Sequence, residues 1–93
     1  MNKGQLVAAV ADRIGDRRAA IVAIDAVLGT VMDTIAAGER VRLLGFGTFS
    51  AATRPERQTR NPKTGVRTMV PATRVPKFNP GAEFRARVAE RRP

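Results

Sequence analysis

The sequence predicts an α+β fold, in which a helical hairpin precedes antiparallel strands, a protruding β-hairpin and a short C-terminal helix. Two observations predict it. The spacing of apolar residues changes from helical to alternating at Glu39, and residues 54–74 lose the core pattern. A length of 93 residues fits one domain, 1–93. We divide it into a helical dimerisation part (1–38), strands with a final helix (39–53 and 75–93) and an arm (54–74).

Residues 3–37 are expected to form two helices joined by a short link. Asn2 is a favourable N-cap, Gly15 can end the first helix in a left-handed conformation, and Asp16 can cap the second. A helix that is apolar around much of its girth needs more than one packing partner. The second helix has this character, with apolar residues at Ala20, Ile21, Ile24, Val27, Leu28, Val31, Met32 and Ile35.

The stretch "RVRLLGFGTFSAATR" alternates and therefore predicts strands. Val41 and Leu43 point to one face, whereas Arg40 and Arg42 point to the other. The glycines on either side of Phe46 indicate a tight bend or bulge between two strands. A third apolar segment, "VPKF" at 75–78, returns the chain to the same sheet.

A short helix is expected to close the fold. Asn79 is a suitable N-cap and Pro80 suits the first helical position. The apolar side of this helix would contain Ala82, Phe84 or Arg85, Val88 and Ala89.

The arm carries a specific turn, "RNPKTG", at its centre. Asn61 suits the first position of the turn, Pro62 the second, and Gly65 a left-handed residue that closes the hairpin. Basic residues recur every few positions along both sides of the turn, at Arg54, Arg57, Arg60, Lys63, Arg67 and Arg74.

Charge is distributed very unevenly along the chain. Of the net charge of +9, residues 1–46 contribute six basic and five acidic groups, a net of +1. Residues 47–93 contribute eleven basic and three acidic groups, a net of +8. A local basic field favours polyanions, nucleic acid first and anionic membrane second.

Catalytic and metal chemistry is disfavoured by composition. The chain has no Cys and no His, which excludes most nucleophile–base pairs and transition-metal sites, so we expect no cofactor and no enzyme. The aspartates on the helices (Asp12, Asp16, Asp25 and Asp33) have the spacing of capping or solvent-facing residues. There is no signal-peptide core and no uninterrupted apolar run of 18 residues, so we expect an intracellular protein without a membrane span.

The predicted core is too small for a stable monomer. Removing the 21 residues 54–74 from the 93 leaves 72, and a single core of that size seldom supplies more than about 3–5 kcal/mol. No disulfide is available to help, because the chain has no Cys. We therefore expect a homodimer with a shared core that includes Phe46, Phe49, Phe78, Ile35 and Leu28.

The basic arm is suited to double-stranded DNA. A two-stranded ribbon is narrow enough to enter a DNA groove, and basic residues on both strands would meet phosphates. Pro62 at the tip is rigid, apolar and without an N–H, so it is suited to slip between base steps and kink the duplex. A dimer would carry two such arms and bend DNA at two points.

The motifs "GFGTF", "RNPKTG" and "VPKFNPG", in this order behind "MNK" and two helices, resemble the bacterial HU proteins of the DNABII family, which also contains integration host factor. The resemblance covers almost the whole chain. It implies an intertwined dimer of identical or paralogous subunits, with a helical body over a β-saddle and arms that wrap the DNA minor groove. It also implies an architectural role in the nucleoid of the cytoplasm.

Several site residues follow from this resemblance. Pro62 matches the intercalating proline of the family, and Asn61 with the six basic residues of the arm matches groove- and phosphate-contacting positions. Lys77 lies near the saddle and Lys3 matches a basic position on the flank of the body. Three positions depart from the family pattern: Thr59 replaces a common Gly or Ala, Glu56 is acidic, and Ala82 stands at a site that is often basic.

Two alternative functions remain open at this stage. One is a protein like integration host factor, with preferred sites chosen largely through DNA deformability. The other is an RNA-binding basic protein, which the absence of any aromatic residue between Phe49 and Phe78 disfavours, since single-strand recognition uses stacking rings. Distorted or nicked duplexes are further candidate ligands.

Overall fold

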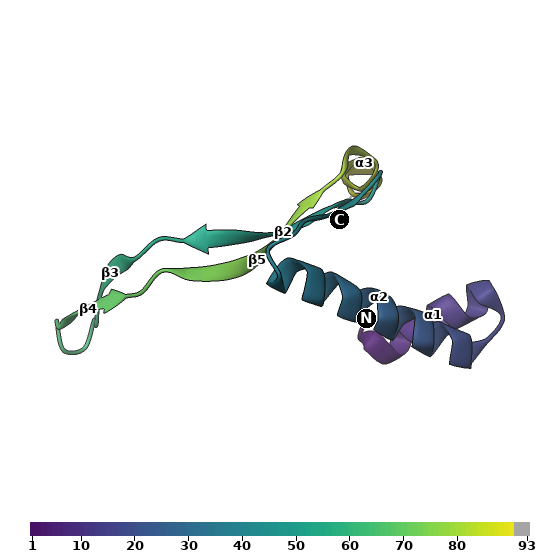
Figure 1. The fold of residues 1–93 in the computed structure, drawn as a ribbon, viewed down its shortest axis with the longest axis horizontal. Helices are drawn as coiled ribbons and strands as arrows, with labels where there is room; N and C mark the ends of the chain where they lie inside the picture. The colour runs from purple at the N-terminus through teal and green to yellow at the C-terminus, as the bar shows by residue number, and fades with distance from the viewer. Residues whose placement is uncertain (91–93) are drawn as a thin grey trace. The chain divides into compact units, whose positions relative to one another are not determined.

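The computed structural model describes residues 1–90, which form three helices and five strands (Figure 1). Residues 91–93, the end of the predicted C-terminal part, lie outside the described residues. The order of elements confirms the predicted α+β fold class. The elements are α1 (Lys3–Ile14), α2 (Arg17–Ala36), β1 (Val41–Leu43), β2 (Gly47–Arg54), β3 (Arg57–Arg60), β4 (Arg67–Val70), β5 (Thr73–Pro80) and α3 (Ala82–Glu90).

The chain contains two compact units, residues 1–34 and residues 35–93, and the boundary falls inside α2. Each unit is described below by itself. The division into a helical part, a sheet with a final helix, and an arm within one domain stays a prediction.

Local capping sets the ends of α1 and the start of α2. The Asn2 side chain accepts a hydrogen bond from the Gln5 backbone N–H at 2.9 Å, and the Gln5 side chain accepts one from the Asn2 N–H at 2.9 Å. Gly15 ends α1 with a φ of 77°. The Asp16 carboxylate accepts from the Ala19 N–H at 3.1 Å. These contacts satisfy orphan helix-end groups and confirm the three predicted caps.

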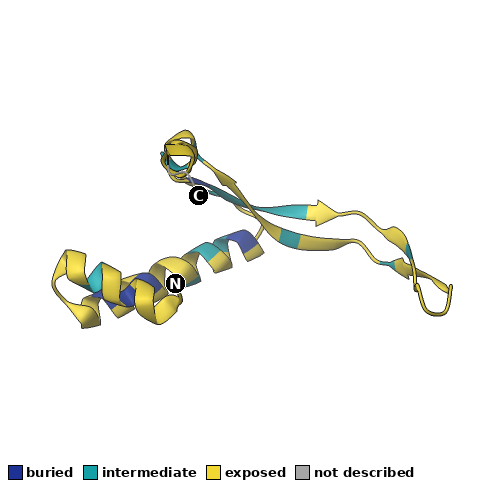
Figure 2. Ribbon diagram, turned by 180° about the vertical axis from the view of Figure 1, so that it is seen from behind, coloured by how far each residue is buried: buried dark blue, intermediate teal, exposed yellow. Residues whose placement is uncertain are grey.

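The first unit has a small core. Val7, Ala20 and Ile24 are buried, and Val10 and Ala11 pack against them. Most of α2 is nevertheless exposed in the single chain (Figure 2). Its exposed apolar side chains are Ile21, Val22, Val27, Leu28 and Met32. The predicted need for more than one packing partner is therefore unmet within one chain.

The apolar character of α2 bears on the expectation that the chain has no membrane span. Residues Arg17–Ala36 are long and apolar enough to cross a membrane by length and composition, although no such segment was expected. The reason is that Asp25 and Asp33 interrupt the run without lowering its average hydropathy enough. One such helix is weak evidence for a membrane span, since a core helix of a soluble protein has the same composition.

The second unit contains an antiparallel sheet with strand order β1-β2-β5, which confirms the predicted three-stranded sheet. Directly opposed residues share a face, and faces alternate along each strand. Val41, Phe49 and Phe78 are in register and define an apolar face. The next register row, Arg42, Thr48 and Asn79, belongs to the opposite, polar face.

Four phenylalanines cluster at one end of this sheet. The ring centroids of Phe49 and Phe78 are 4.6 Å apart, and those of Phe46 and Phe84 are 5.2 Å apart. The Gly81 N–H donates to the Phe46 carbonyl at 2.8 Å, which holds the start of α3 against the β1–β2 turn. Phe46, Phe49 and Phe78 were predicted as core residues, whereas Phe84 was assigned only to the final helix.

The start of α3 differs from the prediction. Asn79 and Pro80 do not cap the helix; they are the last residues of β5, paired with Thr48 and Gly47, and α3 begins at Ala82. The strand tolerates a proline because β5 lies at the edge of the three-stranded sheet, where a missing N–H removes no ladder bond on the open side.

Candidate nucleic-acid interface

The arm is a two-stranded antiparallel ribbon that continues the β2–β5 pair (Figure 1). The last pair of the three-stranded sheet is Arg54 with Thr73. After a short break, β3 and β4 pair from Arg57 opposite Val70 to Arg60 opposite Arg67. The ribbon lies within the predicted arm, 54–74, and its side chains are almost all exposed.

Hydrogen bonds around Asn61 build the tip. Its backbone N–H donates to the Val66 carbonyl at 2.9 Å, and its carbonyl accepts from the Gly65 N–H at 2.7 Å. Its side-chain oxygen accepts from the Lys63 N–H at 2.9 Å. Gly65 has a φ of 72°, so the predicted left-handed residue is present. Pro62 lies between these anchors, exposed, and offers no N–H that would lose hydration on burial.

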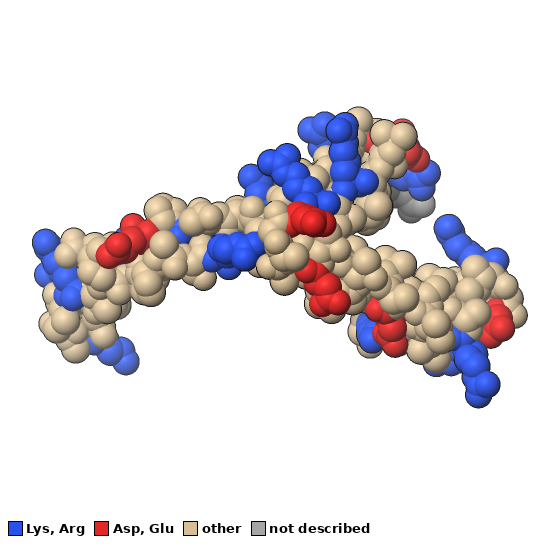
Figure 3. All heavy atoms as spheres, in the orientation of Figure 1, with Lys and Arg blue, Asp and Glu red and all other residues tan. Residues whose placement is uncertain are grey.

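The arm places two arginines directly opposite each other. Arg60 and Arg67 form the last β3–β4 pair, so their side chains share a face next to the tip. Like charges at directly opposed positions destabilise a ribbon. Within residues 1–90 no carboxylate forms an ion pair with either of them. Lys and Arg side chains also gather around the end of the ribbon in Figure 3. An anion between the two arginines would remove the repulsion.

The polar face of the sheet adds further cations. Lys77 pairs with Ser50, and Arg54 follows four register rows further along β2, on the same face. Arg42 also belongs to this face, in the Thr48 row. Arg42 was not among the predicted site residues, although its alternation with Val41 and Leu43 had already placed it opposite the apolar face.

Two predicted contacts have protein partners instead. Arg74 belongs to the apolar face, in the row of Thr53, and its guanidinium donates to the carbonyls of Ile35 and Ala36 at 3.3 and 3.4 Å. In the first unit the Lys3 Nζ lies 2.6 Å from an Asp25 carboxylate oxygen. The role of Arg74 and Lys3 in DNA binding stays a prediction.

The three departures from the family pattern have modest local consequences. The Thr59 hydroxyl donates to the Thr68 carbonyl at 3.4 Å, across the ribbon. Glu56 lies in the break between β2 and β3 and forms no ion pair with a described residue. Ala82 is the first residue of α3.

An exposed basic ribbon with a rigid proline at its tip is typical of the class of β-ribbon nucleic-acid-binding proteins. The chain belongs to the bacterial DNA-binding protein family, whose family model matches residues 1–89.

Named relatives agree with this membership. DNA-binding protein HU 2 of Streptomyces coelicolor is 48% identical over 91% of this chain, but the match spans only 39% of that protein. Integration host factor subunit beta of Herminiimonas arsenicoxydans is 42% identical, with 95% of this chain and 89% of that protein covered. The structure of Anabaena HU in a cocrystal with DNA matches with a TM-score of 0.90 at 43% identity, over 96% of this chain and 98% of that one.

Proposed function

We propose that this protein binds double-stranded DNA with little sequence preference and bends it, as an architectural protein of the nucleoid. The observation that carries the proposal is that Arg60 and Arg67 oppose each other without an ion-pair partner in residues 1–90, beside an exposed Pro62. They lie near the tip of a ribbon that is narrow enough to enter a DNA groove. The likeness to Anabaena HU, which was crystallised with DNA, supports the same ligand.

Phosphates supply most of the binding free energy in this proposal. Arg54, Arg57 and Lys63 would add contacts to those of Arg60 and Arg67, and Lys77 with Arg42 would meet the duplex over the polar face of the sheet. Asn61 would lie in the groove. Such binding depends on release of counterions and therefore weakens as salt rises.

Pro62 would supply the bend. Three hydrogen bonds between Asn61 and residues beyond Pro62 fix the tip, so presenting the ring costs little conformational entropy on binding. Apolar wedges between base steps unstack them and kink the duplex. The ring would therefore act on DNA geometry more than on affinity.

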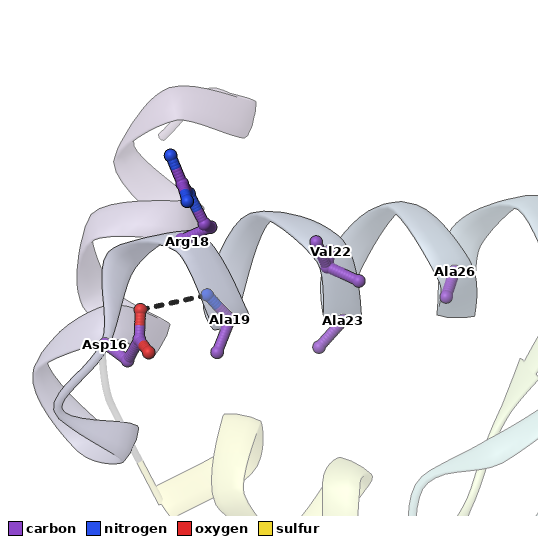
Figure 4. A pocket seen from close by; sticks show the side chains of 6 residues that line it. All are labelled: Asp16, Arg18, Ala19, Val22, Ala23 and Ala26. Atoms are coloured by element: carbon purple, nitrogen blue, oxygen red, sulfur yellow. Dashed lines mark hydrogen bonds between the residues drawn. The ribbon is translucent and has the colours of Figure 1, made fainter.

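The binding form would be a homodimer, or a dimer with a paralogous subunit. In a single chain, Phe46 is 46% exposed, Leu28 43% and Phe78 36%, which is unusual for predicted core residues, whereas Ile35 is buried. On α2, Ala19, Val22, Ala23 and Ala26 line a further shallow apolar groove (Figure 4). A second copy would cover Phe46, Phe78 and Leu28, whereas a membrane is a poor alternative because Asp25 and Asp33 interrupt α2.

Gel-shift titrations of a random-sequence duplex across salt concentrations test the electrostatic part. If the dimer meets about eight phosphates, the slope of log K against log salt is about −7. Replacing Arg60 by Ala should lower affinity for unrelated sequences alike and make the slope shallower. A loss confined to one sequence would instead indicate base reading. Parallel titrations with nicked and pre-bent duplexes measure any preference for distorted DNA.

Pro62→Ala tests the wedge. We expect the bend angle, measured by energy transfer between dyes at the two ends of a duplex, to decrease strongly while affinity changes little. Pro55→Ala is the matched control, because Pro55 is also an arm proline but lies away from the tip. A bend angle that Pro62→Ala leaves unchanged would rule out the wedge role.

The similarity to an integration host factor subunit keeps a second candidate function, recognition of preferred sites. Comparing affinity for random and selected duplexes separates the two, since a preferred site would bind at least about tenfold more tightly. Competition between duplex DNA and structured RNA measures RNA binding in the same assay. We assign no catalytic step to this chain: Asp16 caps α2 and Asp25 pairs with Lys3.

A further inference from the structure

Arg74 differs from the other basic residues of the predicted arm in the face that it occupies. The register pairs it with Thr53, in the rows of Phe49 and Phe78, whereas Arg54 and Lys77 lie on the opposite face. It is also the second residue of β5, one row from the last sheet pair, where the arm begins. Arg74 is thus at the base of the arm, but its side chain is on the apolar face of the sheet.

From this face, the Arg74 side chain contacts the end of α2. Both terminal nitrogens of Arg74 donate, one to the Ala36 carbonyl at 3.4 Å and one to the Ile35 carbonyl at 3.3 Å. The last carbonyls of a helix lack intrahelical partners and carry partial negative charge, so a cation is favourable there. The last turn of α2 has no basic residue of its own and instead contains Asp33. Arg74 supplies the missing cation from another element.

We propose that Arg74 is a positioning residue, which fastens the base of the arm to the last turn of α2 and so fixes the direction in which the ribbon leaves the sheet. This inference rests on the proposed DNA-binding function, because its effect on DNA is exerted through the arm. It replaces the sequence-based expectation that Arg74 touches phosphate. A ribbon without this contact would be presented to DNA over a wider range of angles, which weakens binding and disperses the bend.

Salt dependence separates the two roles. Loss of one phosphate contact in each subunit makes the slope of log K against log salt shallower by about 1.8 for a dimer. Loss of a positioning contact lowers affinity but leaves the number of released counterions, and hence the slope, unchanged. The two variants Arg74→Met and Arg54→Met form a matched pair, because Arg54 lies one row away on the opposite face.

We expect Arg74→Met to bind a random duplex about five- to tenfold more weakly, with an unchanged slope of log K against log salt. For Arg54→Met, we expect this slope to become shallower by about 1.8. At saturating protein, single-molecule energy transfer should show a broader distribution of bend angles for Arg74→Met alone. In the protein without DNA, the Gly38 amide, which donates to the Ile35 carbonyl at 3.0 Å, should exchange with solvent several-fold faster.

A shallower slope for Arg74→Met with unchanged Gly38 exchange would overturn the inference in favour of a phosphate contact. Faster exchange with normal affinity and bending would reduce Arg74 to a local cap and also overturn it. If Arg74→Met does not fold, Arg74→Lys replaces it and should show intermediate affinity with the wild-type slope. Failure of the wild-type protein to bind duplex DNA would instead count against the proposed function itself.

Discussion

Two glycine-containing turns of the second unit join antiparallel strands, and their surroundings are opposite. In the β1–β2 turn, a Cβ added to Gly47 would lie 2.6 Å from the Asn79 carbonyl oxygen and 2.6 Å from the Phe78 ring. At the arm tip, a Cβ added to Gly65 would meet nothing closer than the Arg60 guanidinium at 3.7 Å. The first turn is closely packed at Gly47, whereas the second is open at Gly65.

The difference shows that a glycine-containing turn can serve two purposes. The packed turn fixes the aromatic cluster and the start of α3, so its glycine is required by close approach as well as by its φ of 155°. The open turn is held by its own hydrogen bonds alone and keeps Pro62 and Lys63 accessible. Substitutions in the first turn should therefore change stability, and substitutions in the second should change DNA binding.

Gly47→Ala should have the largest effect. The backbone conformation disfavours any side chain, and the nearest atom is a backbone oxygen that cannot move aside without breaking the β2–β5 ladder. We expect a loss of at least about 3 kcal/mol in the free energy of unfolding. Urea denaturation at fixed protein concentration measures it, with Thr48→Ala on the polar face as the control. A loss below 1 kcal/mol would mean that the turn is not packed as described.

Phe84→Ala tests whether the Phe84 ring of α3 stabilises the β1–β2 turn. The ring of Phe84 is half-buried between Phe46 and Phe78, at centroid distances of 5.2 and 6.0 Å. Because only part of the ring is buried, we expect a loss of about 2 kcal/mol, below the usual range for a fully buried Phe. Val88→Ala, at a side chain that is 61% exposed, should cost less than about 0.5 kcal/mol. Equal losses for the two variants would contradict the assignment of Phe84 to the cluster.

Gly65→Ala addresses the open turn. A non-glycine residue in the left-handed region costs about 1–2 kcal/mol, but here the cost falls on the tip alone. We expect the melting temperature to stay within about 1 °C of the wild type and the affinity for a duplex to fall about five- to tenfold. Gly65→Asn, which tolerates the same conformation, should bind almost normally. A large drop in melting temperature would show that the arm tip is part of the cooperative core.

Local chemistry made much of this fold predictable. The caps at Asn2 and Asp16, the end of α1 at Gly15 and the tip around Asn61 each depend on residues within a few positions of one another. The alternation of β1 likewise revealed its apolar face before any partner strand was known. These features follow from short-range hydrogen bonding and side-chain periodicity.

The errors came from pairing between distant segments. Asn79–Pro80 has the local chemistry of a helix start, yet its pairing with β2 keeps it in a strand. The face of Arg74 follows only from its register with Thr53, which lies 21 positions earlier in the chain. Phe84 is the only aromatic residue of α3, and its two aromatic neighbours, Phe46 and Phe78, lie outside that helix. The sequence pattern of the basic residues therefore identified the arm but could not divide those residues between its outer surface and its base.

The smallest effect is expected for substitution of a glycine that lies outside any turn. Gly29 lies inside α2, and a Cβ added there would have no neighbour within 4 Å in the single chain. Glycine in a helix interior is less favourable than alanine by about 0.8–1.0 kcal/mol, so Gly29→Ala should stabilise each chain by about that amount. Thermal denaturation at several protein concentrations measures the change, with Ala26→Gly as the reverse substitution on the same helix. The sign also reports on the dimer, because a partner subunit packed closely against Gly29 would turn the expected gain into a loss through overpacking.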